Sequence, residues 1–306
     1  MNVYVYPTDR SWFRFLERID GLDEVNFWRP GGRMAFRQLN VGDLFLFRLG
    51  KPENAIAGGG FFAHFAFSPL ARAWELFGVK NGTPDFETFA KSVADYRRRS
   101  ETVADVTWEQ IGNIILTQPF FLPRSQWIPI PADYQTNSPQ GQRFDGKSGS
   151  GRELFDAVYS MFARRQVFDS TALPVEFGET LVKRRLGQGA FSMLVADAYE
   201  KRCAVTGEKT LPVLEAAHIK PVSKGGFHGA SNGLLLRSDV HKLFDRGYVT
   251  IDPKGVFRVS SRLRHDWSNG VVYYAMDGNT IRLPSAADLQ PSPLLLEWHN
   301  DTVYRG

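Results

Sequence analysis

The chain has 306 residues, of which 43% are hydrophobic and 23% are charged. Its length exceeds the roughly 100 to 200 residues of one ordinary domain, so two domains are expected, and its composition excludes a disordered or fibrous protein. The formal net charge of +4 allows a polyanionic partner but is too small to require one.

Cysteine content and apolar runs limit the class of protein further. Cys203 is the only cysteine, which excludes intrachain disulfides and any site that needs two thiolates from this chain. The N-terminus has no basic region followed by an apolar stretch, and no apolar run reaches the roughly 18 residues of a membrane-spanning helix. The sequence therefore predicts a cytoplasmic protein with no membrane segment.

The first part of the chain alternates short apolar stretches with helical patterns. Strands are expected over residues 3–6, 44–49 and 61–67, helices after Ser68 and over 86–98, and further strands over 111–116 and 127–130. This pattern predicts a small α+β module, a curled sheet with peripheral helices.

A polar segment separates this module from the rest of the chain. Residues 135–151 are rich in Gly, Ser, Pro and amide side chains and contain almost no apolar residue, which is a linker composition. The predicted domains are therefore 1–134 and 152–306.

The second part begins with two amphipathic helical patterns, over residues 153–165 and 191–202. A strand-like segment at 211–219 and a glycine-containing loop at 221–231 follow. A helix is expected over 238–245 with Ser238 as its N-cap, and then a hairpin that joins 248–251 to 256–259.

Three polar residues fall at informative places in this second part. The strand-like segment carries His218, the loop delivers Asn232, and the next helix carries His241. Asp245 follows His241 by four positions, so both side chains lie on one helix face, where one turn can supply two ligands to one cation. The three elements are expected to converge on one metal ion.

Residues 203–251 resemble an HNH endonuclease domain of the ββα-metal type. The resemblance rests on Ala217-His218-Ile219, on Asn232-Gly-Leu, and on His241-Lys-Leu-Phe-Asp-Arg-Gly. It implies a phosphodiester hydrolase in which His218 is the general base, Asn232 holds the base or the metal, and His241 binds one divalent cation, with Mg²⁺, Mn²⁺ or Ni²⁺ expected.

The chemistry accounts for these residue types. A neutral imidazole with a pKa near 6.5 is suited to taking a proton from an attacking water molecule. Asn232 can fix the imidazole or its strand without adding a titrating group. A cation held by His241 and Asp245 would stabilise charge on the leaving oxygen.

The chain also departs from the family pattern. Many HNH enzymes carry an Asp or His before the base as a metal ligand, whereas this chain has Ala217. Glu215 lies on the same strand face and is taken as the third ligand. Relatives with a structural zinc ion use paired Cys-x-x-Cys motifs, but Cys203 is followed by Thr206, so no structural zinc is expected.

Other interpretations of the polar residues stay open. Asp245 could pair only with Arg246 or Lys242 on a solvated helix face, and Asn232 before a glycine could form only a turn. Arg237 and Lys224 are placed to meet DNA phosphates, although surface lysines are usually just solvated.

Residues 1–134 resemble the EVE branch of the PUA-like superfamily. The matching features are Trp28 before a glycine-containing loop, the segment 39–43 that enters an apolar strand, the glycine-rich 57–61, and the late strand 127–130. The resemblance implies a pocket with aromatic walls that holds a flipped, often methylated, base.

Tryptophans are the candidate walls of this pocket. Trp28 beside Arg29 lies in a predicted loop, and Trp127 and Trp74 are further candidates for nucleic-acid binding. Each tryptophan could instead be a core residue, and helical spacing favours the core for Trp74.

Together the two parts resemble the EVE-HNH modification-dependent restriction endonucleases. The function implied is cleavage of DNA that carries modified cytosine. Two alternatives remain, namely a non-catalytic nucleic-acid reader on a degenerate HNH scaffold, and a nuclease effector switched on by a nucleotide bound in the first domain. A homodimer is an open option, since a single enzyme often cuts both strands as a dimer.

Overall fold

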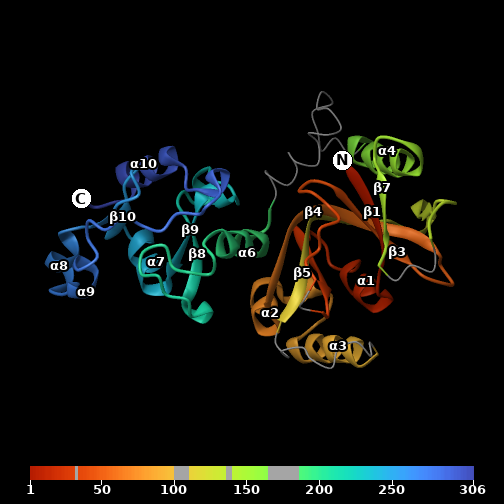
Figure 1. Ribbon diagram of the computed structural model, residues 1–306, viewed down its shortest axis with the longest axis horizontal. Coiled ribbons are helices and arrows are strands. Elements are labelled where there is room, and N and C mark those ends of the chain that lie inside the picture. Colours follow the sequence, from red (N-terminus) through yellow and green to blue (C-terminus); the bar gives the residue numbers. More distant parts are fainter. Residues whose placement is uncertain (32–33, 100–109, 136–139, 165–185) are drawn as a thin grey trace. The chain divides into compact units, whose positions relative to one another are not determined.

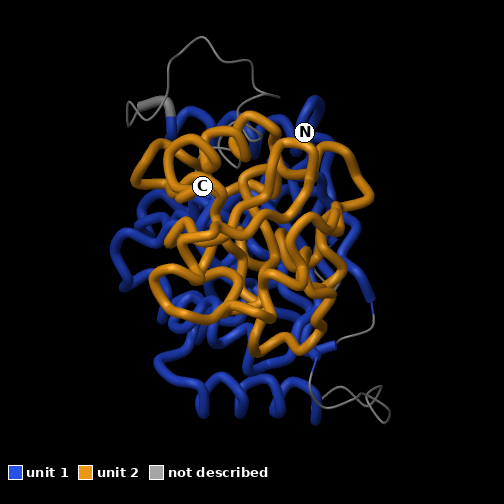
Figure 2. The backbone as a smooth tube through the Cα atoms, turned by 90° about the vertical axis from the view of Figure 1, so that its left-hand side faces the viewer, with its two compact units in different colours: residues 1–190 blue, residues 191–306 orange. Residues whose placement is uncertain are grey.

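The structure is a computed structural model that describes residues 1–31, 34–99, 110–135, 140–164 and 186–306. The chain divides into two compact units, residues 1–190 and 191–306 (Figure 2). Among the described residues, no helix has the length and apolar character needed to span a membrane. The architecture is mixed α+β, as the sequence predicts.

The first unit is built around a sheet that has seven strands in the described part of the chain. The strand order is β2-β5-β4-β3-β1-β7, with β6 paired to β4. Figure 1 labels β1, β3, β4, β5 and β7 of this sheet. β1 and β3 run parallel, and the other pairs are antiparallel. The strands are β1 (Asn2–Pro7), β2 (Glu24–Arg29), β3 (Leu44–Leu49), β4 (Ala55–Pro69), β5 (Gln110–Phe121), β6 (Ile128–Pro129) and β7 (Gln142–Asp145).

Aromatic side chains fill the core of this unit. Every residue of β3 is buried, and Phe45 and Phe47 lie 5.0 and 6.1 Å from the ring of Phe27 on β2. The glycines of β4 allow close strand packing, because a Cβ atom at Gly58 would lie 2.3 Å from the carbonyl oxygen of Phe120. Burial of these rings is the main stabilising contribution to the first unit.

Helices accompany this sheet. Asp9 caps the first helix, where its Oδ1 accepts hydrogen bonds from the backbone N–H groups of Ser11 and Trp12 at 2.8 and 2.9 Å. The helices of the unit are α1 (Arg10–Leu16), α2 (Leu70–Phe77), α3 (Phe86–Arg99) and α4 (Gly149–Arg164).

The segment predicted as a linker differs in the structure. Residues 142–145 form β7, which pairs with β1, and α4 already begins at Gly149. Only Phe144 of β7 is buried, because an edge strand exposes its alternate side chains. Residues 135–151 have the composition of a linker, but the two compact units divide at residue 190.

Trp28 also differs from its predicted loop position, since it lies on β2. This strand was not expected, because polar residues interrupt its apolar pattern. Asn26 is buried there, and its Nδ2 donates to Asn81 Oδ1 at 2.9 Å and to Asn113 Oδ1 at 2.8 Å. Hydrogen bonds satisfy this buried amide, so a polar residue is tolerated inside the sheet.

The second unit contains a ββα arrangement. β8 (Leu214–His218) pairs antiparallel with β9 (Gly233–Arg237), and α7 (Ser238–Asp245) follows at once. The predicted bounds of α7 are confirmed, but Arg237 is its N-cap residue and Ser238 is its first helical residue. α6 (Gln188–Ala198) begins at the end of the first unit, and most of it belongs to the second. The other elements are β10 (Val249–Ile251), β11 (Phe257–Val259), α8 (Arg262–Trp267), α9 (Val271–Tyr274) and α10 (Pro293–Thr302).

Short 3₁₀ turns connect several of these elements. They are η1 (Gly78–Asn81), η2 (Arg124–Gln126), η3 (Leu211–Val213), η4 (Val222–Lys224), η5 (Ala230–Asn232) and η6 (Ala287–Leu289).

Candidate active site and aromatic cavity

His218 ends strand β8, and two other rings fix its imidazole. The ring of Phe191 stacks on it with a centroid distance of 3.9 Å and an interplanar angle of 9°. His218 Nε2 lies 3.0 Å from Nδ1 of His228, which comes from the loop between β8 and β9. Burial, and then the nearby His228 and His241, lower the pKa of His218 from 6.5 to about 4. The ring is therefore neutral near pH 7.

Asn232 is fully buried and bonds to the backbone that follows His218. Its Oδ1 accepts from Lys220 N–H at 2.9 Å, and its Nδ2 donates to the carbonyl oxygens of Lys220 and Phe227 at 2.9 and 2.8 Å. The side chain thus closes the loop between β8 and β9 and fixes the end of the strand that carries His218.

Gly233, which follows Asn232, packs too closely against α6 to carry a side chain. Its φ is −126°, which is ordinary extended backbone, so the Asn-Gly pair is not a left-handed turn here. A Cβ atom at Gly233 would lie 2.4 Å from Val195 Cγ2 and 3.1 Å from the ring of Phe191. The glycine allows α6 to approach the hairpin closely enough for Phe191 to stack on His218.

His241 lies on α7 between two carboxylates. Glu215 Oε2 is 2.6 Å from its Nδ1, and Asp245 Oδ2 is 3.4 Å from its Nε2. Burial raises the pKa of Asp245, nearby His241 opposes this effect, and Glu215 adds to it. The structure thus brings together the three residues predicted as metal ligands.

The donor atoms around His241 suit a divalent cation, but the ring limits how many can share one ion. HNH nucleases generally use a divalent metal ion, and imidazole and carboxylate groups are suitable ligands. The two ring nitrogens point in different directions, so one ion can meet Nδ1 or Nε2. Within the described ranges, no group of three or more His, Cys, Asp or Glu side chains is arranged to hold a metal ion.

The two contacts of His241 differ in length. Ligand atoms about 2.1 Å from one ion lie about 3.0 to 3.4 Å from each other, which matches His241 Nε2 and Asp245. The 2.6 Å contact of Glu215 has the length of a hydrogen bond. A metal-binding histidine commonly donates the N–H of its second ring nitrogen to a carboxylate.

The two basic residues predicted to meet phosphates differ in their surroundings. Arg237 donates to both carboxylate oxygens of Asp239, from Nε at 2.7 Å and from an Nη at 2.8 Å, which holds the pKa of Asp239 below its usual range. Its guanidinium is therefore already paired. Lys224 is exposed at the end of η4.

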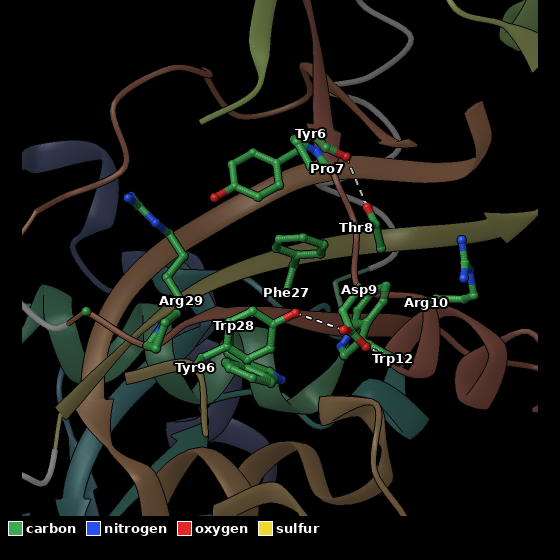
Figure 3. A pocket seen from close by; sticks show the side chains of 12 residues that line it. Tyr6, Pro7, Thr8, Asp9, Arg10, Trp12, Phe27, Trp28, Arg29 and Tyr96 are labelled. Atoms are coloured by element: carbon green, nitrogen blue, oxygen red, sulfur yellow. Dashed lines mark hydrogen bonds between the residues drawn. The ribbon is translucent and has the colours of Figure 1, made fainter. Parts of the chain in front are cut away.

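The first unit holds a cavity of about 620 Å³ with aromatic walls (Figure 3). Trp28 and Arg29, two of the residues predicted to bind nucleic acid, line it. The other lining residues include Tyr6, Asp9, Trp12, Phe27 and Tyr96.

Polar groups at the cavity wall have defined positions. The Tyr96 hydroxyl donates to Asp9 Oδ2 at 2.8 Å, as Figure 3 shows, and Trp28 Nε1 donates to the carbonyl oxygen of Asn81 at 3.0 Å. Burial raises the pKa of Tyr6, and nearby Arg29 opposes this effect. The cavity therefore combines ring faces with a carboxylate, a guanidinium and a phenol.

The other two predicted wall tryptophans do not line this cavity. Trp74 packs in a cluster with Phe86 and Phe89, as its helical spacing indicated. Trp127 packs against the main core and donates its Nε1–H to the carbonyl oxygen of Leu122 at 2.9 Å.

Several residues of the HNH site and of the aromatic cavity were not predicted from the sequence. His228 was treated only as part of a loop, although a histidine between His218 and Asn232 is a usable signal. Asp9 and Tyr96 are 87 residues apart in the chain, and only the fold brings them to one wall.

Residues 203–252 match the family model described as HNH endonuclease. The second unit therefore contains an HNH endonuclease domain, which spans β8, β9 and α7 and includes His218, Asn232 and His241. The chain thus carries the domain of an HNH nuclease at residues 203–252.

Comparisons with curated proteins and with solved structures do not extend the assignment beyond the HNH domain. No curated protein matches the sequence significantly. Among solved structures, the "Modification dependent TagI restriction endonuclease" is similar over 98% of this chain and 81% of its own, with 12% sequence identity and a TM-score of 0.30. A TM-score of this size does not establish a shared fold.

Proposed function

We propose that this protein is a metal-dependent DNA endonuclease that selects DNA carrying modified cytosine. The observation that carries the nuclease part is the placement of His218, Asn232 and His241 on the ββα elements of the HNH domain. The aromatic cavity of the first unit supports the selection part.

His218 is the general base of this reaction. Its imidazole is neutral near pH 7, because its pKa is lowered to about 4, so it can accept a proton from the attacking water molecule. Phe191 holds the plane of the ring, and Asn232 holds the backbone beyond it. The water oxygen then attacks phosphorus in line with the leaving oxygen.

His241 Nε2 and Asp245 hold one divalent cation, and Glu215 accepts the Nδ1–H of His241. This assignment keeps two of the three predicted ligands and gives Glu215 an orienting role, in agreement with the distances of 3.4 and 2.6 Å. Mg²⁺, Mn²⁺ or Ni²⁺ would serve, and when bound the ion stabilises negative charge on the phosphoryl and leaving oxygens.

The cavity of the first unit holds a base that has left the DNA stack. Its volume of about 620 Å³ falls in the range of ordinary ligand pockets. Trp28, Phe27 and Tyr96 offer ring faces, and stacking on such rings recovers about 1 to 3 kcal/mol per base against the cost of unstacking. Asp9 and Arg29 supply an acceptor and a donor for the edge of the base.

Plasmid cleavage tests both parts of the proposal. Unmodified, methylated and hydroxymethylated plasmids are incubated with the full chain and Mg²⁺, Mn²⁺ or Ni²⁺. We expect cleavage of modified DNA only, and a loss of about 100- to 10,000-fold in rate for His218→Ala. Trp28→Ala should reduce the preference for modified DNA about 10- to 100-fold, whereas Trp267→Ala, at an exposed tryptophan outside the cavity, should not change it.

The outcomes separate the two parts. Equal cleavage of all plasmids by the wild type would contradict the selection of modified cytosine while leaving the nuclease assignment in place. An absence of cleavage with every metal and every DNA would contradict the nuclease assignment and favour a nucleic-acid reader.

A further inference from the structure

His228 contacts His218, the proposed general base, and is not among the site residues predicted from the sequence. It lies in the loop between β8 and β9, and its Nδ1 is 3.0 Å from Nε2 of His218. The two imidazole rings meet at an angle of 63° with centroids 4.9 Å apart, so they approach edge to edge at the nitrogens and do not stack. The contact is therefore a hydrogen bond between two imidazoles.

Such a bond has two directions, because one nitrogen must donate and the other accept. If His228 Nδ1–H donates, a neutral His218 carries its own proton on Nδ1, and neither nitrogen of His218 can accept the proton of water. If His218 Nε2–H donates, its Nδ1 keeps a free lone pair. Within the described part of the chain, Nδ1 of His218 has no hydrogen-bond partner.

We propose that His228 is a positioning residue, which accepts Nε2–H of His218 and thereby makes Nδ1 the basic nitrogen. This inference rests on the proposed role of His218 as general base. When Nδ1 takes the proton of water, Nε2 keeps its own proton, so the bond to His228 persists through the transfer. The opposite direction would require the pair to break or to rotate first.

The neighbouring residues support a fixed orientation. Phe191 stacks on His218 with an interplanar angle of 9° and thus restrains the plane of the ring, while His228 restrains rotation within that plane. The loop that carries His228 is itself held, because Asn232 Nδ2 donates to the carbonyl oxygen of the preceding Phe227 at 2.8 Å. A base that is held in one tautomer loses little rate to wrong orientations.

Nuclear magnetic resonance of histidine nitrogens tests the tautomer directly. The chain has 6 histidines, so long-range proton–nitrogen spectra of the full chain labelled with ¹⁵N-histidine can be assigned with single variants. At pH 7 we expect His218 to be in the Nε2–H form in the wild type and to become a mixture of both forms in His228→Ala. His265→Ala, at an exposed histidine, should leave the signals of His218 unchanged.

Cleavage kinetics supply the second readout. His228→Ala should lower kcat at least about 10-fold with little change in KM, because the substrate still binds while the base is badly oriented. His228→Asn should recover most of kcat, since its Oδ1 can accept at the position of the imidazole Nδ1. A structural role alone would not be rescued in this way.

The results also separate this inference from the proposed function. A wild-type His218 that carries its proton on Nδ1, or a tautomer that does not respond to His228→Ala, would overturn the role of His228. Full cleavage by His218→Ala would overturn the proposed general base, while the spectra would still report the direction of the bond. If His228→Ala does not fold, His228→Asn and the wild-type spectra decide.

Discussion

His241 contacts a carboxylate through each of its ring nitrogens, and the two contacts differ in length. Glu215 accepts at 2.6 Å from Nδ1, whereas Asp245 lies 3.4 Å from Nε2. A ligand of a divalent cation is strengthened by its negative charge, whereas a residue that only orients the ring needs only to accept a hydrogen bond from it. The two acidic residues can therefore be separated by conservative substitution.

Asp245→Asn should lower the affinity for Mn²⁺ about 10-fold or more, because a charged ligand becomes a neutral amide. Glu215→Gln should have a smaller effect, since the amide oxygen still accepts Nδ1–H of His241. Titration calorimetry measures both affinities, and Asp301→Asn, at an exposed carboxylate of α10, is the control. An equal loss for Glu215→Gln and Asp245→Asn would make Glu215 a ligand as well.

At the scale of elements, one amide determines the loop between β8 and β9. The Asn232 side chain accepts one hydrogen bond and donates two, all with backbone groups of Lys220 and Phe227. The loop carries His228, and the strand before it carries His218. The same side chain therefore supports the stability of the loop and the placement of both histidines.

Asn232→Asp should lower the free energy of unfolding by at least about 2 kcal/mol, because a buried carboxylate would face two carbonyl oxygens without a proton to donate. Urea denaturation measures the change. Asn269→Asp is the matched control, since Asn269 is exposed and only accepts, from Gly270 N–H at 2.7 Å. Equal stability of both variants would show that the donated bonds contribute nothing.

The predicted and observed elements agree where local pattern and burial coincide. The strand over 44–49 and the helix over 238–245 have the predicted bounds. In both segments the apolar residues that set the local pattern are also the residues that are buried in the core. β2 and β7 were missed. Asn26 in β2 is satisfied by distant amides, and β7 is an edge strand with one buried residue, so neither has the usual alternation.

At the scale of the whole molecule, the pH dependence of stability includes a histidine that is buried in neutral form, His299. His299 of α10 is 2% exposed, its Nε2–H donates to the carbonyl oxygen of Phe244 at 3.1 Å, and the Thr250 hydroxyl donates to its Nδ1 at 2.8 Å. Burial lowers the pKa of His299 from 6.5 to about 4, although the bond to Phe244 opposes this effect. The folded chain therefore takes up this proton at lower pH than the unfolded chain.

Stability should fall as the pH is lowered through the window from 6.5 to 4, because only the unfolded state binds the proton of His299 there. From pH 7 to pH 5 this group alone should cost about 2 kcal/mol. His299→Gln removes the titrating group, so its urea-derived unfolding free energy should change less over this interval than that of the wild type. Equal pH dependence of both proteins would contradict the assignment.

The sequence by itself predicted the HNH domain, with a strand that leads to His218 and a helix that carries His241. His218, Asn232 and His241 could be assigned because a strand, a loop and a helix follow one another within one short segment, where local pattern fixes the order of the side chains. Glu215 could be placed near the site by strand alternation.

Only the tertiary structure decided the partners of these residues. The bond from His228 to His218, the stacking of Phe191, the pairing of Arg237 with Asp239 and the aromatic cavity around Trp28 depend on packing between elements. Asp9 and Tyr96 meet across 87 positions of the chain. Periodicity reports which face of an element is apolar, but it does not report which distant side chain that face will meet.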